Sequence, residues 1–283
     1  MKVCRAVLRA VFLVALLALV PTAVAACGGD ETSDESQSIV FIASNADNGI
    51  AVTGPPTAES GRTEISLNNE SEKAADLQLL RVEGDHSADE VAAALTGATR
   101  GQPLPDWFFA GGGVGLTGPG ESQTVTQILE PGTYYAFDTN SRTTSPELGS
   151  ELTVSGDPSD QTLEADATVS AFEYDFKADG LTTGDNEVLF ENTGSQPHHV
   201  IYAPIVGDAT PDEIEKAIRE DQAQPPIDLE NERATAVLDS GGRQLVDLDF
   251  AEPGRYALLC FVSDRQGGPP HAFKGMIAEV DVE

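Results

Sequence analysis

Two stretches of this chain, residues 69–95 and 192–218, follow one residue pattern 123 positions apart. Each begins with an Asn after an alternating apolar stretch, reaches a Gly-Asp pair, and then opens an amphipathic segment with Asp-Glu. A further match, Glu-Pro-Gly followed by an aromatic Tyr, recurs at 130–134 and 252–256, at an offset of 122. A register kept over so long a stretch indicates duplication of one structural unit. The chain is therefore expected to fold as two versions of the same unit.

Short apolar segments separated by turn residues fill both copies of the repeat. They are rich in Val, Ile, Leu, Phe and Tyr, and Gly, Pro, Asn and Asp stand between them. In the second copy they cover 187–191, 199–203, 244–250, 255–262 and 276–282. This spacing is typical of an antiparallel β-sandwich, so we expect an all-β chain of two tandem sandwiches.

Each copy also predicts one short helix, which follows the Gly-Asp pair. The first is expected to begin after Ser87 and the second after Thr210. Pro211 stands at the first position of the second helix, and acidic residues fill its first turn. Both features favour a helix start, because proline lacks the amide hydrogen that this turn leaves unbonded and negative charge suits the helix dipole.

The first 26 residues form a predicted export signal, which is excluded from the fold. Basic residues at positions 2, 5 and 9 precede an uncharged apolar run over 10–20, and small residues follow at 23, 25 and 26. The run is too short to span a bilayer as a helix. The predicted organisation is a signal peptide over 1–26, a polar tether over 27–37, a sandwich over 38–155, a linker over 156–166 and a second sandwich over 167–283.

The end of this signal resembles a bacterial lipobox, Val24-Ala25-Ala26-Cys27, and a polar stretch follows at once. The resemblance implies a lipid on Cys27. It places the mature protein at the outer face of the cytoplasmic membrane or in the cell envelope, anchored by that lipid. The alternative is an ordinary secretory cleavage in which Cys27 carries no lipid.

The charge balance restricts the partners of the chain. Acidic residues number 47 and basic residues 16, so the formal net charge is −31 at pH 7. A basic surface for nucleic acid is therefore absent, and we expect no nucleic-acid partner. An acidic surface is compatible with steering toward a basic protein partner, although solvation is its ordinary role.

The chain has three cysteines, and their positions leave one of them single. Cys4 is removed with the signal, Cys27 is the predicted lipid site, and Cys260 remains. A lone cysteine in an exported chain is buried, reactive or bound to a metal ion, because it has no disulfide partner.

Three segments of the second copy resemble the cupredoxins, the plastocyanin-like blue-copper proteins. Residues 188–198 look like their first ligand strand with its Asn-x-Gly turn and Pro-His end. Residues 253–260 look like the strand that ends in the copper cysteine, and 271–276 reproduces the His-x4-Met hairpin. The resemblance implies tandem Greek-key cupredoxin-like sandwiches, with one type 1 copper ion held by His198, Cys260 and His271 and by an axial Met276.

The residue types agree with that chemistry. One thiolate and two imidazoles, with a weak thioether, are the ligands that blue-copper sites use. His199 could replace His198, but strand alternation points the two side chains to opposite faces, and the Pro-His match favours His198. The chain departs from small members of the family in its long Cys260 to His271 loop, which has ten residues.

The first copy lacks these ligands. At the repeat offsets Ala75 and Asp138 stand for His198 and Cys260, and residues 143–149 contain neither His nor Met. One copper site in the second copy is therefore predicted, and the first copy is expected to serve as a spacer, docking or stabilising module.

The predicted function is that of a lipid-anchored, one-electron copper carrier with a protein redox partner. The four histidines are too few for a multicopper oxidase, and His86 and His199 cannot complete the second copper site of a nitrite reductase. We therefore expect no enzymatic activity. The alternative is a non-redox copper-handling protein or a metal-free envelope scaffold with the same fold.

Overall fold

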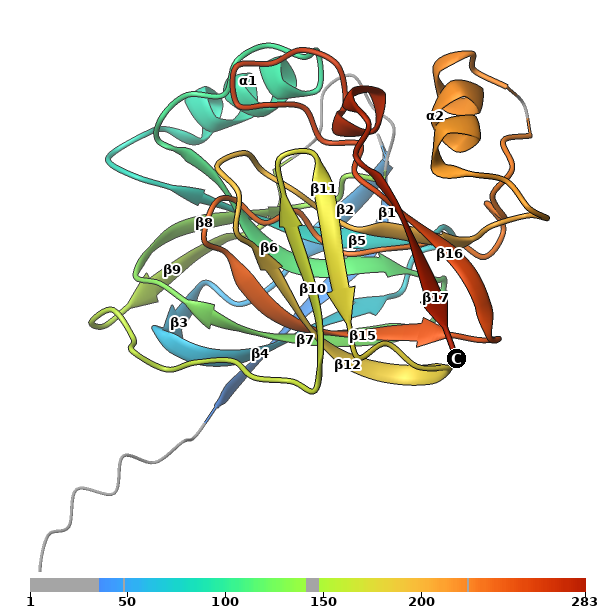
Figure 1. Cartoon of the computed structure of the whole chain (residues 1–283). Helices are drawn as coiled ribbons and strands as arrows, with labels where there is room; N and C mark the ends of the chain where they lie inside the picture. Colours follow the sequence, from blue (N-terminus) through green and yellow to red (C-terminus); the bar gives the residue numbers. More distant parts are fainter. Residues whose placement is uncertain (1–35, 48, 141–147, 223) are drawn as a thin grey trace, which may run out of the picture. The chain divides into compact units, whose positions relative to one another are not determined.

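The computed structural model describes residues 36–47, 49–140, 148–222 and 224–283. These residues belong to one compact unit. The predicted signal peptide, Cys27 and most of the predicted tether lie outside the described residues. Strands dominate, and two α-helices interrupt them (Figure 1).

The first half of this unit contains nine strands and one helix. They are β1 (Gln37–Ala46), β2 (Gly49–Thr53), β3 (Thr57–Glu59), β4 (Gly61–Asn69), β5 (Ala75–Val82), α1 (Ala88–Ala98), β6 (Phe108–Thr117), β7 (Ser122–Leu129), β8 (Gly132–Phe137) and β9 (Glu151–Ser155).

The second half contains eight strands, one α-helix and one 3-10 helix. They are β10 (Ala167–Phe172), β11 (Asp175–Asp179), β12 (Gly184–Asn192), β13 (Ile201–Pro204), α2 (Pro211–Arg219), β14 (Arg233–Ala234), β15 (Arg243–Phe250), β16 (Gly254–Leu259), η1 (His271–Lys274) and β17 (Ile277–Val282).

The two halves have the same strand order, as expected of a duplication. The order β7-β4-β1-β2 in the first half corresponds to β15-β12-β10-β11 in the second. The facing sheets correspond in the same way, with β6-β5-β8-β9 matching β14-β13-β16-β17, and β3 is an extra edge strand of the first half. The parallel pair β1 and β4 has its counterpart in β10 and β12. The prediction of two tandem sandwiches, each with one short helix, is confirmed.

One sheet runs through both halves. Strands β7 and β15 pair antiparallel, with Gln127 opposite Gln244 and Thr126 opposite Leu245, so that eight strands form a continuous sheet. Residues 156–166, predicted as the linker, are all described and contain neither helix nor strand. The domain boundaries stay a prediction, and the structure adds that the halves share this sheet.

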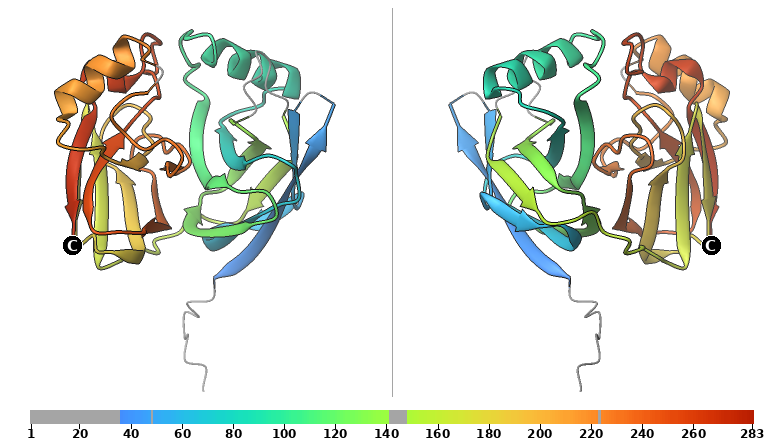
Figure 2. Two further views of the ribbon diagram at one scale, coloured as in Figure 1. Left: turned by 90° about the vertical axis from the view of Figure 1, so that its right-hand side faces the viewer. Right: turned by 90° about the vertical axis from the view of Figure 1, so that its left-hand side faces the viewer.

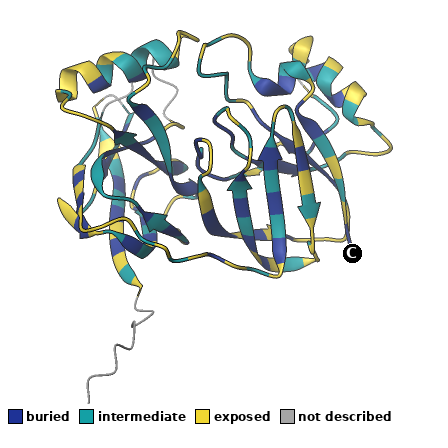
Figure 3. Cartoon of the chain, turned by 60° about the vertical axis from the view of Figure 1, so that its left-hand side comes forward, coloured by how far each residue is buried: buried dark blue, intermediate teal, exposed yellow. Residues whose placement is uncertain are grey.

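Side-chain alternation explains why these segments are strands. Along β12, Val188 and Phe190 are buried, whereas the residues on either side of them, Glu187, Leu189 and Glu191, are partly or fully exposed. Such an alternation turns one face of each strand inward. The inward faces of both halves contribute to one apolar core, in which Phe41, Phe190 and Phe250 are among the largest fully buried side chains. Figure 3 shows these buried positions along the strands.

Both helices begin where the sequence predicts. Ser87 and Thr210 are the N-cap residues, and each side chain accepts a hydrogen bond from the amide of the Glu three positions later. Each Glu side chain in return accepts from the N-cap amide, which completes a capping box. The helices lie at the same end of their respective halves (Figure 2).

Candidate metal centre

Three separate segments supply the predicted histidine and cysteine ligands. His198 precedes β13 and forms an isolated bridge with Leu238. Cys260 directly follows β16, and His271 opens η1. Ile201 at the start of β13 pairs with Leu259 at the end of β16. The residue segments that carry His198 and Cys260 therefore lie side by side at one end of these two strands.

The backbone then returns His271 to the same place. The amide of Ala272 donates to the carbonyl of Cys260 at 2.7 Å, and the amide of His271 donates to the carbonyl of Val262 at 2.9 Å. The long loop is therefore closed at its base. The strand predicted over 255–262 ends at Leu259 instead, because the chain turns into this loop at Cys260.

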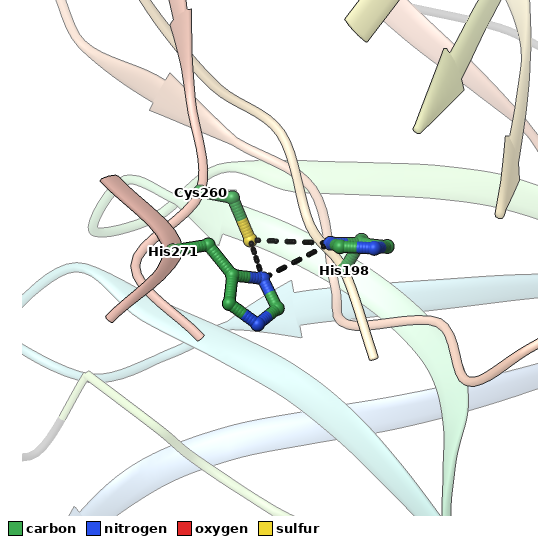
Figure 4. Close-up of side chains that lie close together, drawn as sticks. All are labelled: His198, Cys260 and His271. Atoms are coloured by element: carbon green, nitrogen blue, oxygen red, sulfur yellow. Dashed lines mark hydrogen bonds between the residues drawn. The ribbon is translucent and has the colours of Figure 1, made fainter. Parts of the chain in front are cut away.

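The three side chains point toward one another (Figure 4). The Nδ1 atoms of His198 and His271 are 3.1 Å apart. The Sγ atom of Cys260 lies 3.5 Å from Nδ1 of His271 and 3.8 Å from Nδ1 of His198. All three residues have no solvent-exposed surface. Among the residues that the structure describes, they form the one group of His, Cys, Asp and Glu close enough to hold a metal ion.

Burial sets the protonation of this group. It lowers the pKa of His198 to about 4, with a smaller contribution from the charge of His271. Burial also lowers the pKa of His271, against the opposing effect of Asp264. The same cause raises the pKa of the Cys260 thiol to about 12. In the metal-free chain at pH 7 the imidazoles are neutral and the thiol keeps its proton, so a metal ion gains two ready nitrogen donors and displaces one proton.

The spacing of the three atoms matches the size of a metal ion. A point equidistant from both Nδ1 atoms and Sγ lies about 2.0 Å from each. Bonds from a first-row metal ion to His nitrogen and Cys sulfur are about 2.0–2.3 Å. One thiolate with two imidazoles in a trigonal arrangement is the equatorial set of blue-copper proteins. These residues fit a type 1 copper site.

Met276, the predicted axial ligand of the copper site, is fully buried in the same apolar cluster as Cys260. Its amide donates to the carbonyl of His271 at 3.0 Å, because Gly275 adopts a left-handed conformation that ends η1. The backbone thus holds Met276 beside η1, the short helix that His271 opens. A weak thioether donor is what a type 1 site uses in the axial position.

His199 lies apart from the copper site, although neither histidine belongs to a strand, since the strand predicted from residue 199 begins at Ile201. Its Nε2 atom accepts a hydrogen bond from the amide of Phe261 at 2.9 Å. The residue lines a cavity of about 190 Å³ that also includes Asp76 and Thr235. The structure therefore brings His198 to the site and leaves His199 outside it.

Replacing these two histidines separately is expected to give opposite results. His198→Ala removes a nitrogen donor, so the copper complex should lose or shift its visible band. His199→Ala removes a side chain outside the cluster, so the band should remain. Optical spectra of both copper-loaded variants check this, and loss of the band in His199→Ala alone would assign the ligand to position 199.

Sequence reasoning missed the residues that surround His271. Its Nε2 atom is 3.0 Å from Oδ1 of Asp264, and Asp264 also accepts from Tyr174 and Lys274. Only one signal was present in the sequence, a charged Asp-Arg pair inside the Cys260 to His271 loop. In so acidic a chain, such a pair cannot be told apart from the ordinary charged residues of a solvated surface.

The first half carries a different group at the corresponding position. Asp138 follows β8 as Cys260 follows β16, and it accepts a hydrogen bond from the amide of Asp76 at 3.0 Å. The Asp76 carboxylate accepts in turn from Thr139. Burial, and then the neighbouring Asp138, raises the pKa of Asp76 to about 7. The copper ligands are thus replaced by a carboxyl and hydroxyl cluster.

Comparison with known proteins gave matches among solved structures only. No family model and no curated protein matches the chain. Auracyanin from the photosynthetic bacterium Roseiflexus castenholzii is 21% identical, with 41% of this chain and 94% of auracyanin covered and a TM-score of 0.28.

Two larger structures match over more of the chain. Lac15 from a marine microbial metagenome is 14% identical, with 81% of this chain and 63% of Lac15 covered and a TM-score of 0.29. A copper nitrite reductase from Nitrosomonas europaea is 15% identical, with 88% and 94% covered and a TM-score of 0.26. At these TM-scores the cupredoxin-like fold of the chain rests on its own strand order and ligand cluster.

Proposed function

We propose that this chain carries single electrons at one copper ion bound by His198, Cys260, His271 and Met276. The observation that carries the proposal is the convergence of two Nδ1 atoms and one Sγ atom within 3.8 Å in a fully buried cluster. When bound there, copper supplies a one-electron couple between Cu(II) and Cu(I).

The chain's own residues favour transfer of electrons over reaction with a substrate. The three ligands belong to segments fixed by backbone hydrogen bonds, so they need little movement between the two oxidation states. None of them has exposed surface, and a substrate therefore has no direct access to the cluster. Both features suit a carrier, which exchanges electrons at its surface without opening the site.

A copper titration tests this proposal. One equivalent of Cu(II) added to the metal-free mature chain is expected to give an intense blue or green band, one bound ion per chain, and reversible bleaching by ascorbate. Colourless or irreversible binding would point instead to a copper-handling protein, and failure to bind copper would point to a scaffold.

The proposed partner is a protein with a basic docking face. The support is the net charge of −31, which attracts opposite charge over the distance at which two proteins meet. Such attraction weakens as salt shortens the screening length, so the rate of electron exchange should fall with ionic strength.

Export and lipid anchoring remain part of the proposal. Among the described residues, no helix is long and apolar enough to cross a membrane. Cys27→Ser is expected to prevent lipid attachment, so the variant should move from the detergent phase to the aqueous phase in a partition assay. Unchanged processing and partition would contradict the anchor.

A further inference from the structure

The long loop between Cys260 and His271 contains two adjacent charged residues, and the side chains of both form hydrogen bonds with other segments of the chain. Asp264 contacts a copper ligand, and Arg265 contacts the first half of the chain. Loops of this length are ordinarily mobile unless tied down. The contacts of these two residues therefore bear directly on where His271 lies.

Asp264 holds the outer nitrogen of His271. Its Oδ1 atom is 3.0 Å from Nε2 of His271, whose Nδ1 faces the copper site. The hydroxyl of Tyr174 donates to the same Oδ1 at 3.0 Å, and Lys274 forms an ion pair with Oδ2. A carboxylate on the outer nitrogen fixes the tautomer and ring orientation of a metal-binding histidine and makes it a stronger donor.

Arg265 fixes the loop to both halves. Its guanidinium donates to Asp239 at 2.6 Å and to the carbonyls of Pro105 and Phe108 at 3.0 and 2.9 Å. It also lies over the ring of Phe109, 4.9 Å from the centroid. The side chains of Arg265 and Asp239 are only 15% and 10% exposed, so solvent screens this pair weakly.

The Asp239 contact also reaches the other histidine ligand. Asp239 directly follows Leu238, whose amide and carbonyl both bond to the backbone of His198 at 2.8 and 2.9 Å. The amide of Arg265 donates to Oε1 of Gln196, two residues before His198. Arg265 thereby connects the segment that carries His198 with the loop that leads to His271.

Two backbone contacts continue this attachment on the first half. The amide of Leu104 donates to the carbonyl of Arg265 at 2.7 Å. Gly267, with φ of +79°, lies so close to Gly101 that a Cβ atom there would be 2.3 Å from the Gly101 carbonyl oxygen. Only glycine allows this conformation and this approach.

We infer that Asp264 and Arg265 are positioning residues of the copper site, and that the first half serves as the rigid support for the Cys260 to His271 loop. The inference rests on the proposed copper-binding function. It assigns a role to the first half, which lacks the copper ligands: the first half holds the Cys260 to His271 loop in place.

Charge variants beside His271 test the role of Asp264 through the reduction potential. Asp264→Asn keeps an acceptor but loses the negative charge, so Cu(II) binding should weaken about tenfold relative to Cu(I). That ratio corresponds to a rise of about 59 mV for a one-electron couple. Lys274→Met removes the positive charge that neutralises Asp264, so the potential should fall. Potential shifts of the same sign in both variants, or no shift, would overturn the role of Asp264. A loop that merely loosened would shift the potential in the same direction in both variants.

Arginine variants test the support by the first half. Arg265→Ala should weaken Cu(II) binding at least tenfold and speed hydrogen exchange at the Leu104 amide in the metal-free mature chain. Arg255→Ala is the matched control, since Arg255 also contacts one carboxylate, Glu279, and two carbonyls, Gly207 and Ala209. Equal effects of the two variants on affinity and exchange would overturn the inference.

The two proposals can fail separately. A wild-type chain that forms no coloured copper complex would contradict the proposed function. Exchange at Leu104 is measured without copper, so it still decides whether Arg265 ties the loop to the first half.

Discussion

Cys260→Ser is expected to abolish the visible band of the copper-loaded chain completely. The band of a blue-copper protein arises from charge transfer between thiolate sulfur and Cu(II), and a hydroxyl oxygen does not provide it. Sγ of Cys260 lies 3.5 and 3.8 Å from the two Nδ1 atoms. Cys260 is the one cysteine among the described residues, so no other of them can supply a thiolate to this cluster. Absorption spectra at equal copper loading provide the measurement.

The fold of this variant should survive. Serine is slightly smaller than cysteine, and its hydroxyl can bond to the nearby imidazole nitrogens in the buried cluster. Thermal unfolding of the metal-free variant therefore serves as the control, together with His199→Ala, which should keep its colour. A coloured Cys260→Ser protein would end the blue-copper interpretation.

Acid is expected to destabilise the metal-free chain well above the pH at which ordinary carboxylates titrate. Burial lowers the pKa of His198 and of His199 to about 4. In the unfolded chain each imidazole takes up a proton below about pH 6.5, whereas the folded chain resists protonation down to about pH 4. The stability that these histidines contribute is present above pH 6.5 and is lost as the pH falls toward 4.

One carboxyl acts in the opposite direction. Asp76 keeps its proton up to about pH 7 in the folded chain, whereas it ionises above pH 3.8 in the unfolded chain. The stability that it contributes to the folded chain is therefore lost as the pH rises from 3.8 to 7. Burial also lowers the pKa of His271, so three histidines act against one carboxyl and the chain takes up net protons on unfolding. The free energy of unfolding should then fall as the pH drops from 6 to 4.5, on the order of 1 kcal/mol per pH unit.

Urea unfolding at constant ionic strength measures this slope, and two variants separate the contributions. Asp76→Asn removes the opposing group, so the slope should become steeper. His199→Gln removes one histidine and keeps an acceptor for the Phe261 amide, so the slope should decrease. A wild-type stability that is flat or rises toward pH 4.5 would contradict the prediction.

Local patterns in the sequence were sufficient for several features. Ser87 and Thr210 mark the helix starts because a capping box is formed by residues three positions apart, which the sequence displays directly. The 123-residue repeat predicted two units of one topology because matching apolar alternation and turn residues produce matching strands. The resemblance of three segments to cupredoxins predicted that His198, Cys260 and His271 lie together, and the structure brings them into one cluster.

Other features depend on contacts between segments far apart in the sequence, and only the tertiary structure decides them. Nothing local in Gln127 or Gln244 indicates that their strands pair and join the two halves into one sheet. Nothing local in Asp264 and Arg265 separates them from the many solvated charges of an acidic chain. Their role follows from where the first half places Pro105 and Phe108 and where η1 places His271. The resemblance in the sequence predicted which residues bind copper, whereas the packing of one copy against the other decided how their atoms are held, because packing depends on both partners of each contact at once.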